Sequence, residues 1–362
     1  MEFNIALLAG DGIGPEVTEQ ACKVLQATGE RFGHTFHFSE GLIGAVAIDR
    51  TGSPLPEETL ELCRRSDAVL FGAIGDPKYD NDPSARVRPE QGLLKMRREL
   101  GLYANVRPVK TFPALVDMSP LKRGIAMNTD IIMVRELTGG IYFGRPQGRS
   151  EDGNTAYDTC VYSRYEIERV VRLACEYALQ RKKRVTVIDK ANILATSRLW
   201  RETAKRIAME YSAITMDFMY VDNAAMQLIQ HPSSFDVIVT ENMFGDILSD
   251  EASVISGSMG MMPSASIGTS TSVFEPIHGS YPQAAGKNIA NPCGTILSAA
   301  MMLDHAFRLN IEAAAITGAV EKSVETGFVT ADLDPEHPKP TSEVGTWISD
   351  YIRKKINETY SG

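Results

Sequence analysis

The chain has 362 residues, a formal net charge of −9, and apolar and charged fractions of 43% and 23%. This length exceeds one ordinary hydrophobic core, so two domains are expected, and the composition is typical of a globular protein. An acidic chain lacks the basic face that nucleic-acid binding needs, and no apolar run reaches the ~18 residues of a membrane span. Because the first residues also lack the apolar stretch of a signal peptide, we expect a cytoplasmic protein with no nucleic-acid or membrane partner.

Apolar runs alternate with helix-like segments along the chain, which predicts the α/β class. Residues 67–75 form a continuous apolar run that is typical of a strand buried on both faces of a parallel sheet, and a long loop is expected at 75–89. Residues 4–9 read as a strand, followed by the loop GDGIGP and a helix at 16–32. A dinucleotide fingerprint would need glycine where Pro15 stands, so an ordinary Rossmann fold is not expected. The five cysteines are scattered without a CxxC pair and are interpreted as free packing thiols.

A helical stripe is expected after Pro89. Glu90, Leu93, Leu94 and Arg97 follow one another at i, i+3, i+4 and i+7, which places them on one helix face. This stripe is compatible with an ordinary amphipathic helix. It is equally compatible with a pocket wall, in which the leucines contact an apolar group and the arginine binds a carboxylate.

Two further arginines could bind anions. Arg107 lies in the segment NVRP, and Arg135 ends a strand-like run and is followed by the glycine pair of RELTGGIYFG. Tyr142 in the same segment offers a phenol beside the cation, although a tyrosine is more often a half-buried packing residue.

Charged side chains also follow two other strand-like runs. Lys190 comes two residues after the run 185–188, next to Asp189, and Asp222 comes after the apolar run that ends in Tyr220 and Val221. The carboxyl ends of parallel strands are where α/β proteins place ligands, so Lys190 is a candidate general base. An ordinary surface lysine is the competing interpretation.

Asp246 and Asp250 lie four residues apart in a helix-like segment after the run 237–239, and therefore share a helix face. Like charges at this spacing oppose helix formation, and a bound cation would relieve them. Taken alone, the pair fits a solvated acidic face better than a metal site.

The segment EPIHGSYPQ at 275–283, which continues to Asn291, is rich in glycine and proline and precedes a helix expected from about Thr295. A loop of this kind before a helix N-terminus could hold the phosphates of an adenosine cofactor. It could equally be a structural Ω-loop.

Seven of these segments occur together and in order: LLAGDGIGPE, GLLKMRRELGLYANVRP, RELTGGIYFG, DKANIL, VDNAAM, TENMFGDILSDEAS and EPIHGSYPQAAGKNIANP. In this respect the chain resembles the isocitrate/isopropylmalate family of β-decarboxylating dehydrogenases over nearly its whole length. The resemblance implies two αβα domains with a mixed sheet and no Rossmann fold. It implies a discontinuous cofactor-side domain at 1–102 and 257–362, and an inserted dimerisation and metal-site domain at 103–256.

The resemblance also implies an oxidative decarboxylation in a homodimer with shared active sites. Asp246 and Asp250, with Asp222 of the partner subunit, would bind Mg²⁺ or Mn²⁺. Lys190 of the partner subunit would accept the proton of the substrate's C2 hydroxyl, and Tyr142 would later protonate the enolate carbon. The substrate's carboxylates would meet three arginines, which are Arg97, Arg107 and Arg135.

Substrate and cofactor choice follow from further positions. An apolar wall of Leu93, Leu94 and Ile193, beside Glu90, favours 3-isopropylmalate, an intermediate of leucine biosynthesis, over the tricarboxylate isocitrate. Decarboxylation of D-malate or tartrate is the alternative. The cofactor loop would contribute six residues: Glu275, His278, Gly279, Ser280, Gln283 and Asn291. Gln283 stands where the family commonly has an aspartate for the ribose, but because no cation is present there for a 2′-phosphate, NAD is expected.

Overall fold

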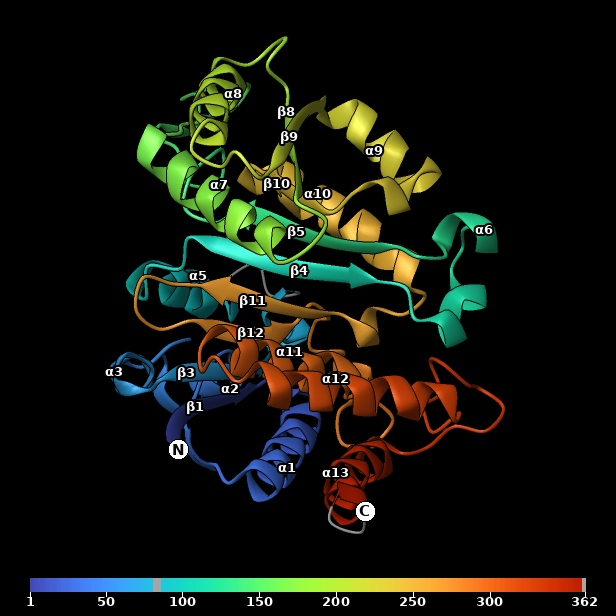
Figure 1. Ribbon diagram of the computed structural model, residues 1–362. Helices are drawn as coiled ribbons and strands as arrows, with labels where there is room; N and C mark the ends of the chain where they lie inside the picture. The colour runs from blue at the N-terminus through green and yellow to red at the C-terminus, as the bar shows by residue number, and fades with distance from the viewer. Residues whose placement is uncertain (81–85, 360–362) are drawn as a thin grey trace. The chain divides into compact units, whose positions relative to one another are not determined.

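The computed structural model describes residues 1–80 and 86–359 of the chain. The contacts divide it into two compact units, one made of Met1–Gly101 with Ser258–Gly362, and the other of Leu102–Gly257. Each unit contains its own strands and helices, which Figure 1 labels along the chain.

The first unit contains five strands in the order β2-β1-β3-β12-β11. All neighbouring pairs are parallel except β11 with β12, which is antiparallel. Every residue of β3 is buried, as its continuous apolar sequence predicted. The strands are β1 (Glu2–Gly10), β2 (Thr35–Glu40), β3 (Ala68–Ala73), β11 (Pro263–Ile267) and β12 (Val273–Pro276).

Three long helices, α1, α11 and α12, pack together with the C-terminal helix α13 in this unit (Figure 1). Helix α1 begins at Gly14, next to Pro15, and ends at Phe32. The following Gly33 has a φ of 75° and closes the helix in the left-handed conformation. The helices are α1 (Gly14–Phe32), α2 (Ala45–Thr51), α3 (Glu57–Arg65), α4 (Pro77–Asp80), α5 (Glu90–Glu99), η4 (Met259–Met261), η5 (Pro282–Ala284), α11 (Cys293–His305), α12 (Asn310–Glu325) and α13 (Thr341–Thr359). The short helix α4 falls within the loop expected at 75–89, of which residues 81–85 lie outside the described residues.

The second unit contains five strands in the order β4-β5-β10-β8-β9. The pair β4 and β5 is antiparallel and the other pairs are parallel. A separate two-stranded sheet is formed by β6 and β7, which the hydrophobic pattern did not reveal. The strands are β4 (Ala104–Lys110), β5 (Asp130–Glu136), β6 (Gln147–Arg149), β7 (Ala156–Asp158), β8 (Arg184–Asp189), β9 (Thr215–Tyr220) and β10 (Val237–Thr240).

Helices α7 and α10 both pack on β5, and Figure 1 shows them on opposite sides of the sheet. Helix α7 begins with a capping box of Ser163 and Glu166, and the Glu241 side chain caps α10. The helices are η1 (Pro113–Met118), α6 (Arg123–Ala126), α7 (Arg164–Leu179), α8 (Ala195–Ala208), α9 (Val221–Gln230), η2 (Pro232–Ser234), α10 (Asn242–Ser253) and η3 (Val254–Ser256).

The predicted α/β class with a mixed sheet is confirmed, since both units combine parallel and antiparallel strands. Among the described residues, none of the helices has both the length and the apolar composition needed to cross a membrane.

Candidate active site

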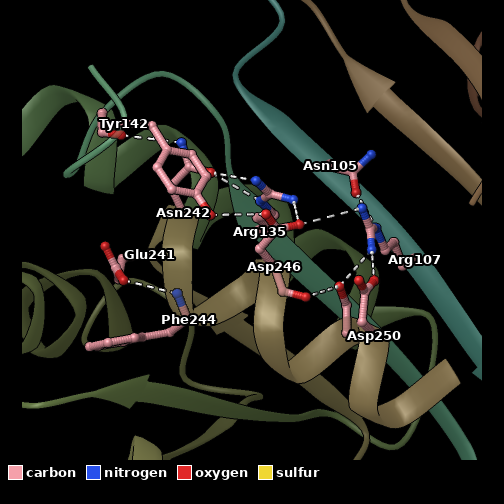
Figure 2. A network of polar contacts seen from close by, with 11 residues as sticks. Asn105, Arg107, Arg135, Tyr142, Glu241, Asn242, Phe244, Asp246 and Asp250 are labelled. Atoms are coloured by element: carbon pink, nitrogen blue, oxygen red, sulfur yellow. Dashed lines mark hydrogen bonds and ion pairs between the residues drawn. The ribbon is translucent and has the colours of Figure 1, made fainter. Parts of the chain in front are cut away.

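Arg135 at the end of β5 is the centre of a buried polar network in the second unit (Figure 2). Its Nε and Nη2 donate to the Asn242 side-chain oxygen at 3.0 and 2.8 Å, and its Nη1 binds Asp246. The Tyr142 hydroxyl donates to the other oxygen of Asp246 at 3.0 Å. The Arg135 guanidinium also lies 5.9 Å from the centre of the Tyr142 ring. A cation, a phenol and a carboxylate therefore meet in one place.

Arg107 on β4 joins the second carboxylate to this network. Its Nη1 lies 2.8 Å from Asp250 and 2.7 Å from the Ser249 hydroxyl, and its Nη2 lies 4.0 Å from Asp246. Asn105 accepts from the Nε of Arg107 at 2.7 Å. The structure thus brings both aspartates of α10 together with two of the three predicted arginines.

The arginine side chains of this network are largely buried, whereas the two aspartate side chains are more exposed to solvent. The Arg135 side chain is 5% exposed, whereas those of Asp246 and Asp250 are 34% and 68% exposed. Burial and the adjacent Asp246 carboxylate raise the pKa of the Tyr142 phenol, which keeps it protonated and able to donate.

The donor set suits a hard divalent cation. Asp246 and Asp250 supply carboxylate oxygens from one helix face, and Mg²⁺ is commonly held by one or two carboxylates together with water and substrate oxygens. Within the part of a single chain that the structure describes, no group of three or more His, Cys, Asp or Glu side chains is placed to hold a metal ion.

Lys190 and Asp222 form an ion pair of 2.9 Å at the ends of β8 and β9. The hydrogen bond from Lys190 holds the pKa of the Asp222 carboxyl below its usual value. The preceding residue, Asp189, is buried and accepts from Arg201 at 2.8 and 2.9 Å, and Arg201 stacks over Tyr220 at 5.0 Å. No hydrogen bond or ion pair connects Lys190 or Asp222 to the α10 carboxylates among the described residues.

The helix expected after Pro89 is present, whereas the pocket wall that it would form stays a prediction. Helix α5 of the first unit carries the stripe of Glu90, Leu93, Leu94 and Arg97, and the Leu94 side chain is 46% exposed. Ile193, which follows Lys190 in the second unit, is 64% exposed. Exposed apolar side chains of this kind are free to contact an apolar ligand group.

The loop at 275–291 contacts the glycine loop at 10–14 within the first unit. The Ile13 N–H donates to the Ser280 carbonyl at 2.8 Å, and a Cβ on Gly12 would clash with that carbonyl. Ser280 and Glu275 are buried, Gly279 and Gln283 are exposed, and Asn291 donates to Asp332 at 3.0 Å.

His278 in this loop has a buried Nε2 without a partner among the described residues, while its Nδ1 lies 3.0 Å from the Gly279 carbonyl. Burial lowers the pKa of His278, so its ring is neutral near pH 7 and can accept or donate a hydrogen bond. This buried, unpartnered ring nitrogen fits the expected adenosine ligand.

A separate cavity of about 680 Å³ lies in the first unit between α1, α2 and the ends of β1 and β2, with Leu42 and Arg50 in its lining. None of the predicted site residues lines it.

Several supporting residues were not expected from the sequence: Asn105, Tyr162, Glu241 and Asn242 around the Arg135 network, and Asp189 and Arg201 beside Lys190 and Asp222. All of them except Arg201 are buried. Glu241 and Asn242 directly follow β10, so the strand-end rule that was applied to Lys190 would have identified them. Asn105 and Tyr162 had no comparable local signal.

Known proteins with similar sequences and structures agree with this architecture. The family model described as isocitrate/isopropylmalate dehydrogenase matches residues 4–348. A 3-isopropylmalate dehydrogenase of Bacteroides fragilis is 55% identical over 98% of this chain and 100% of its own length. One from Bacillus subtilis is 55% identical over 92% of each chain.

Solved structures match as well. An isocitrate dehydrogenase from Methylococcus capsulatus has a TM-score of 0.85 at 36% identity, covering 97% of this chain and 99% of its own. A β-decarboxylating dehydrogenase from Thermococcus kodakarensis has a TM-score of 0.82 at 35% identity, covering 99% of both chains. The predicted fold type is thereby confirmed, and the chain belongs to the isocitrate/isopropylmalate dehydrogenase family.

Proposed function

We propose that the protein is a 3-isopropylmalate dehydrogenase, which oxidises and decarboxylates (2R,3S)-3-isopropylmalate to 4-methyl-2-oxopentanoate and CO₂ as NAD⁺ is reduced. The observation that carries the proposal is the cluster of Arg107, Arg135, Tyr142 and the two α10 aspartates in a chain whose curated relatives bear that name. The reaction is a step of leucine biosynthesis.

The arginines bind the substrate's carboxylates in this proposal. Arg107 and Arg135 are already held by Asn105, Asn242 and the aspartates, so they lose little conformational freedom when an anion binds. The family resemblance adds Arg97 to the anion ligands. It also assigns Leu93, Leu94 and Ile193 to the isopropyl group, with about 0.8 kcal/mol for each buried CH₂, and places Glu90 beside them.

Asp246 and Asp250, with Asp222 of the partner subunit, would hold Mg²⁺ or Mn²⁺. When bound, the cation supplies a Lewis acid at the C2 oxygen, and NAD⁺ supplies the hydride acceptor. Lys190 of the partner subunit would accept the C2 hydroxyl proton. Tyr142, which remains protonated in this environment, donates a proton to the carbon from which CO₂ has departed.

The cofactor loop would bind NAD through Glu275, His278, Gly279, Ser280, Gln283 and Asn291. Support comes from the buried Nε2 of His278, which lacks a partner among the described residues, and from the sequence Gln283-Ala284, which offers no cation to a 2′-phosphate.

A homodimer with shared sites follows from the roles assigned to Lys190 and Asp222. The packed helices α9 and α10 carry apolar side chains that are exposed in the single chain, which is the pattern of an association surface. These side chains are Met226 at 54%, Ile229 at 39% and Ile247 at 60% exposure, and Val254, which begins η3 directly after α10, is 52% exposed.

The test is NADH formation by the purified protein with Mg²⁺ and, in turn, 3-isopropylmalate, D-malate, tartrate and isocitrate. We expect the highest kcat/KM with 3-isopropylmalate. A higher value with D-malate or tartrate would support the alternative dehydrogenase, and comparable rates with isocitrate would refute the role of the apolar wall.

A further inference from the structure

The side chain of Asn242 joins Arg135 to the loop that carries Tyr142. Its oxygen accepts from two nitrogens of Arg135, at 3.0 and 2.8 Å, and its Nδ2 donates to the Gly139 carbonyl at 3.2 Å. Asn242 is 1% exposed, so water does not compete for these bonds. One amide therefore orients the guanidinium and anchors the start of the tyrosine loop (Figure 2).

Tyr162 and Glu241 fix the backbone of Asn242 at the start of α10. The Tyr162 hydroxyl accepts from the Asn242 N–H at 2.9 Å and donates to Glu241 at 3.1 Å. The other oxygen of Glu241 accepts from the Phe244 N–H at 2.9 Å, which caps α10. The Tyr162 ring lies edge-on to Trp200 at 5.5 Å between centres. Asn242 is thus fixed at the first turn of the helix that carries both aspartates.

The tyrosine loop is shaped to lie against Tyr162. A Cβ on Gly139 would lie only 2.6 Å from the Tyr162 ring, and Gly140 adopts a φ of 80°. The Gly140 N–H donates to the Val161 carbonyl at 2.9 Å. The close approach requires glycine at these positions, and it brings the Gly139 carbonyl within reach of the Asn242 amide.

An amide is suited to this position because it is neutral. It accepts from Arg135 without adding a second negative charge to that of Asp246, which already binds Nη1 of the guanidinium. A carboxylate at the same place would pair the guanidinium with two anions and weaken its attraction for an anionic substrate, and it could not donate to Gly139.

We propose that Asn242 is a positioning residue, which holds Arg135 for the substrate's carboxylate and fixes the loop that carries Tyr142. The substrate part of this inference rests on the proposed function, whereas the anchoring of the loop does not. Asn242 does not touch the reacting atoms in this proposal, because it acts through Arg135 and Gly139.

The test compares Asn242→Ala, Asn242→Asp and Tyr162→Phe with the wild-type protein and with Asn310→Asp, a matched change at the first residue of α12. Titration calorimetry with 3-isopropylmalate and Mg²⁺, in the absence of NAD⁺, measures acid binding without turnover. Steady-state kinetics give the two KM values, and hydrogen–deuterium exchange reports on residues 139–144. Because aspartate at the start of a helix is favourable to the helix dipole, Asn242→Asp should still fold.

We expect both Asn242 variants to bind the acid about tenfold to a hundredfold more weakly, with the KM for NAD⁺ changed less than about twofold. Exchange in residues 139–144 should be faster in these variants, Tyr162→Phe should show a smaller change in the same direction, and Asn310→Asp should resemble wild type. Acid binding within about twofold of wild type in Asn242→Ala would overturn the inference. If wild-type protein forms no NADH with any of the four acids, the proposed function fails, and unchanged exchange in residues 139–144 would then separately refute the anchoring role of Asn242.

Discussion

The Lys190 ammonium and the Asp222 carboxylate lie 2.9 Å apart because β8 and β9 run parallel in a register that aligns Asp189 with Tyr220. Each residue follows the end of its own strand, so the pairing of two strands creates the pair of charges. The Asp189–Arg201 ion pair and the contact of Arg201 with Tyr220 connect the same two strand ends. Lys190 and Asp222 therefore form one charged pair that depends on the pairing of β8 with β9.

Replacement of Lys190 tests its role as the base. Lys190→Met should lower kcat for NADH formation by about a hundredfold or more, because the C2 hydroxyl proton then has no acceptor. The melting temperature should change little, since the ion pair that is lost is with Asp222, whose side chain is 66% exposed. Lys182→Met, on an exposed turn after α7, is the matched control. If Lys190→Met retained most of the wild-type kcat, the assignment would be wrong.

Removal of the metal tests the aspartates of α10. Chelation by EDTA should abolish NADH formation, and added Mg²⁺ or Mn²⁺ should restore it. Asp250→Asn should raise the Mg²⁺ concentration for half-maximal activity about tenfold or more, because it removes one anionic oxygen ligand. Glu251→Gln, one residue later on α10, should leave the Mg²⁺ dependence unchanged. Equal Mg²⁺ dependence in both variants would contradict the metal assignment.

The apolar wall on α5 can be tested at Leu94, which is 46% exposed in the structure. Leu94→Ser should lower kcat/KM for 3-isopropylmalate by about tenfold, because contact with the isopropyl group is lost, and should lower it less for D-malate. Ile311→Ser, at an exposed apolar residue of α12, is the control for a general surface effect. An equal loss with both acids would show that Leu94 does not select the isopropyl group.

Glu136 provides a test of stability against pH. Its side chain is fully buried, and burial raises the pKa of its carboxyl above the usual value of 4.5 despite hydrogen bonds from Thr138 and Gly139. The native state therefore binds more protons than the unfolded state, so the stability contributed by this group is complete below pH 4.5 and is lost as the pH rises through the native pKa.

Glu136→Gln lacks this titration. The free energy of unfolding of the variant minus that of the wild-type protein should therefore increase as the pH rises from 4.5 through the native pKa of Glu136. Urea denaturation at a series of pH values measures the difference. A difference that is flat or decreases with pH would contradict the predicted direction.

The exposed apolar face of α9 and α10 tests the homodimer. Ile247→Glu should shift sedimentation from dimer towards monomer, because a charge in an apolar interface must be desolvated. NADH formation should fall in parallel if the active sites are shared. Leu179→Glu, at an exposed leucine that ends α7, should remain dimeric and active. A monomeric wild-type protein with full activity would refute shared sites.

Much of the local structure could be predicted because its causes lie close together in the chain. The continuous apolar run of β3 predicted a buried strand, and Pro15 indicated the start of α1. The hairpin of β6 and β7 could not be predicted, because its exposed strands carry no alternation of buried and exposed residues.

The sequence by itself determined the α/β class and the placement of Asp246 and Asp250 on one helix face, because strand burial and the helical repeat depend on near neighbours. Only the tertiary structure decided which side chains surround these aspartates. Arg107 and Arg135 reach α10 through the pairing of β4 with β5 and the packing of α10 on β5, and Asn242 binds Arg135 from the start of the same helix. These contacts depend on the order of strands in the sheet, which the chain establishes only when distant segments pack together.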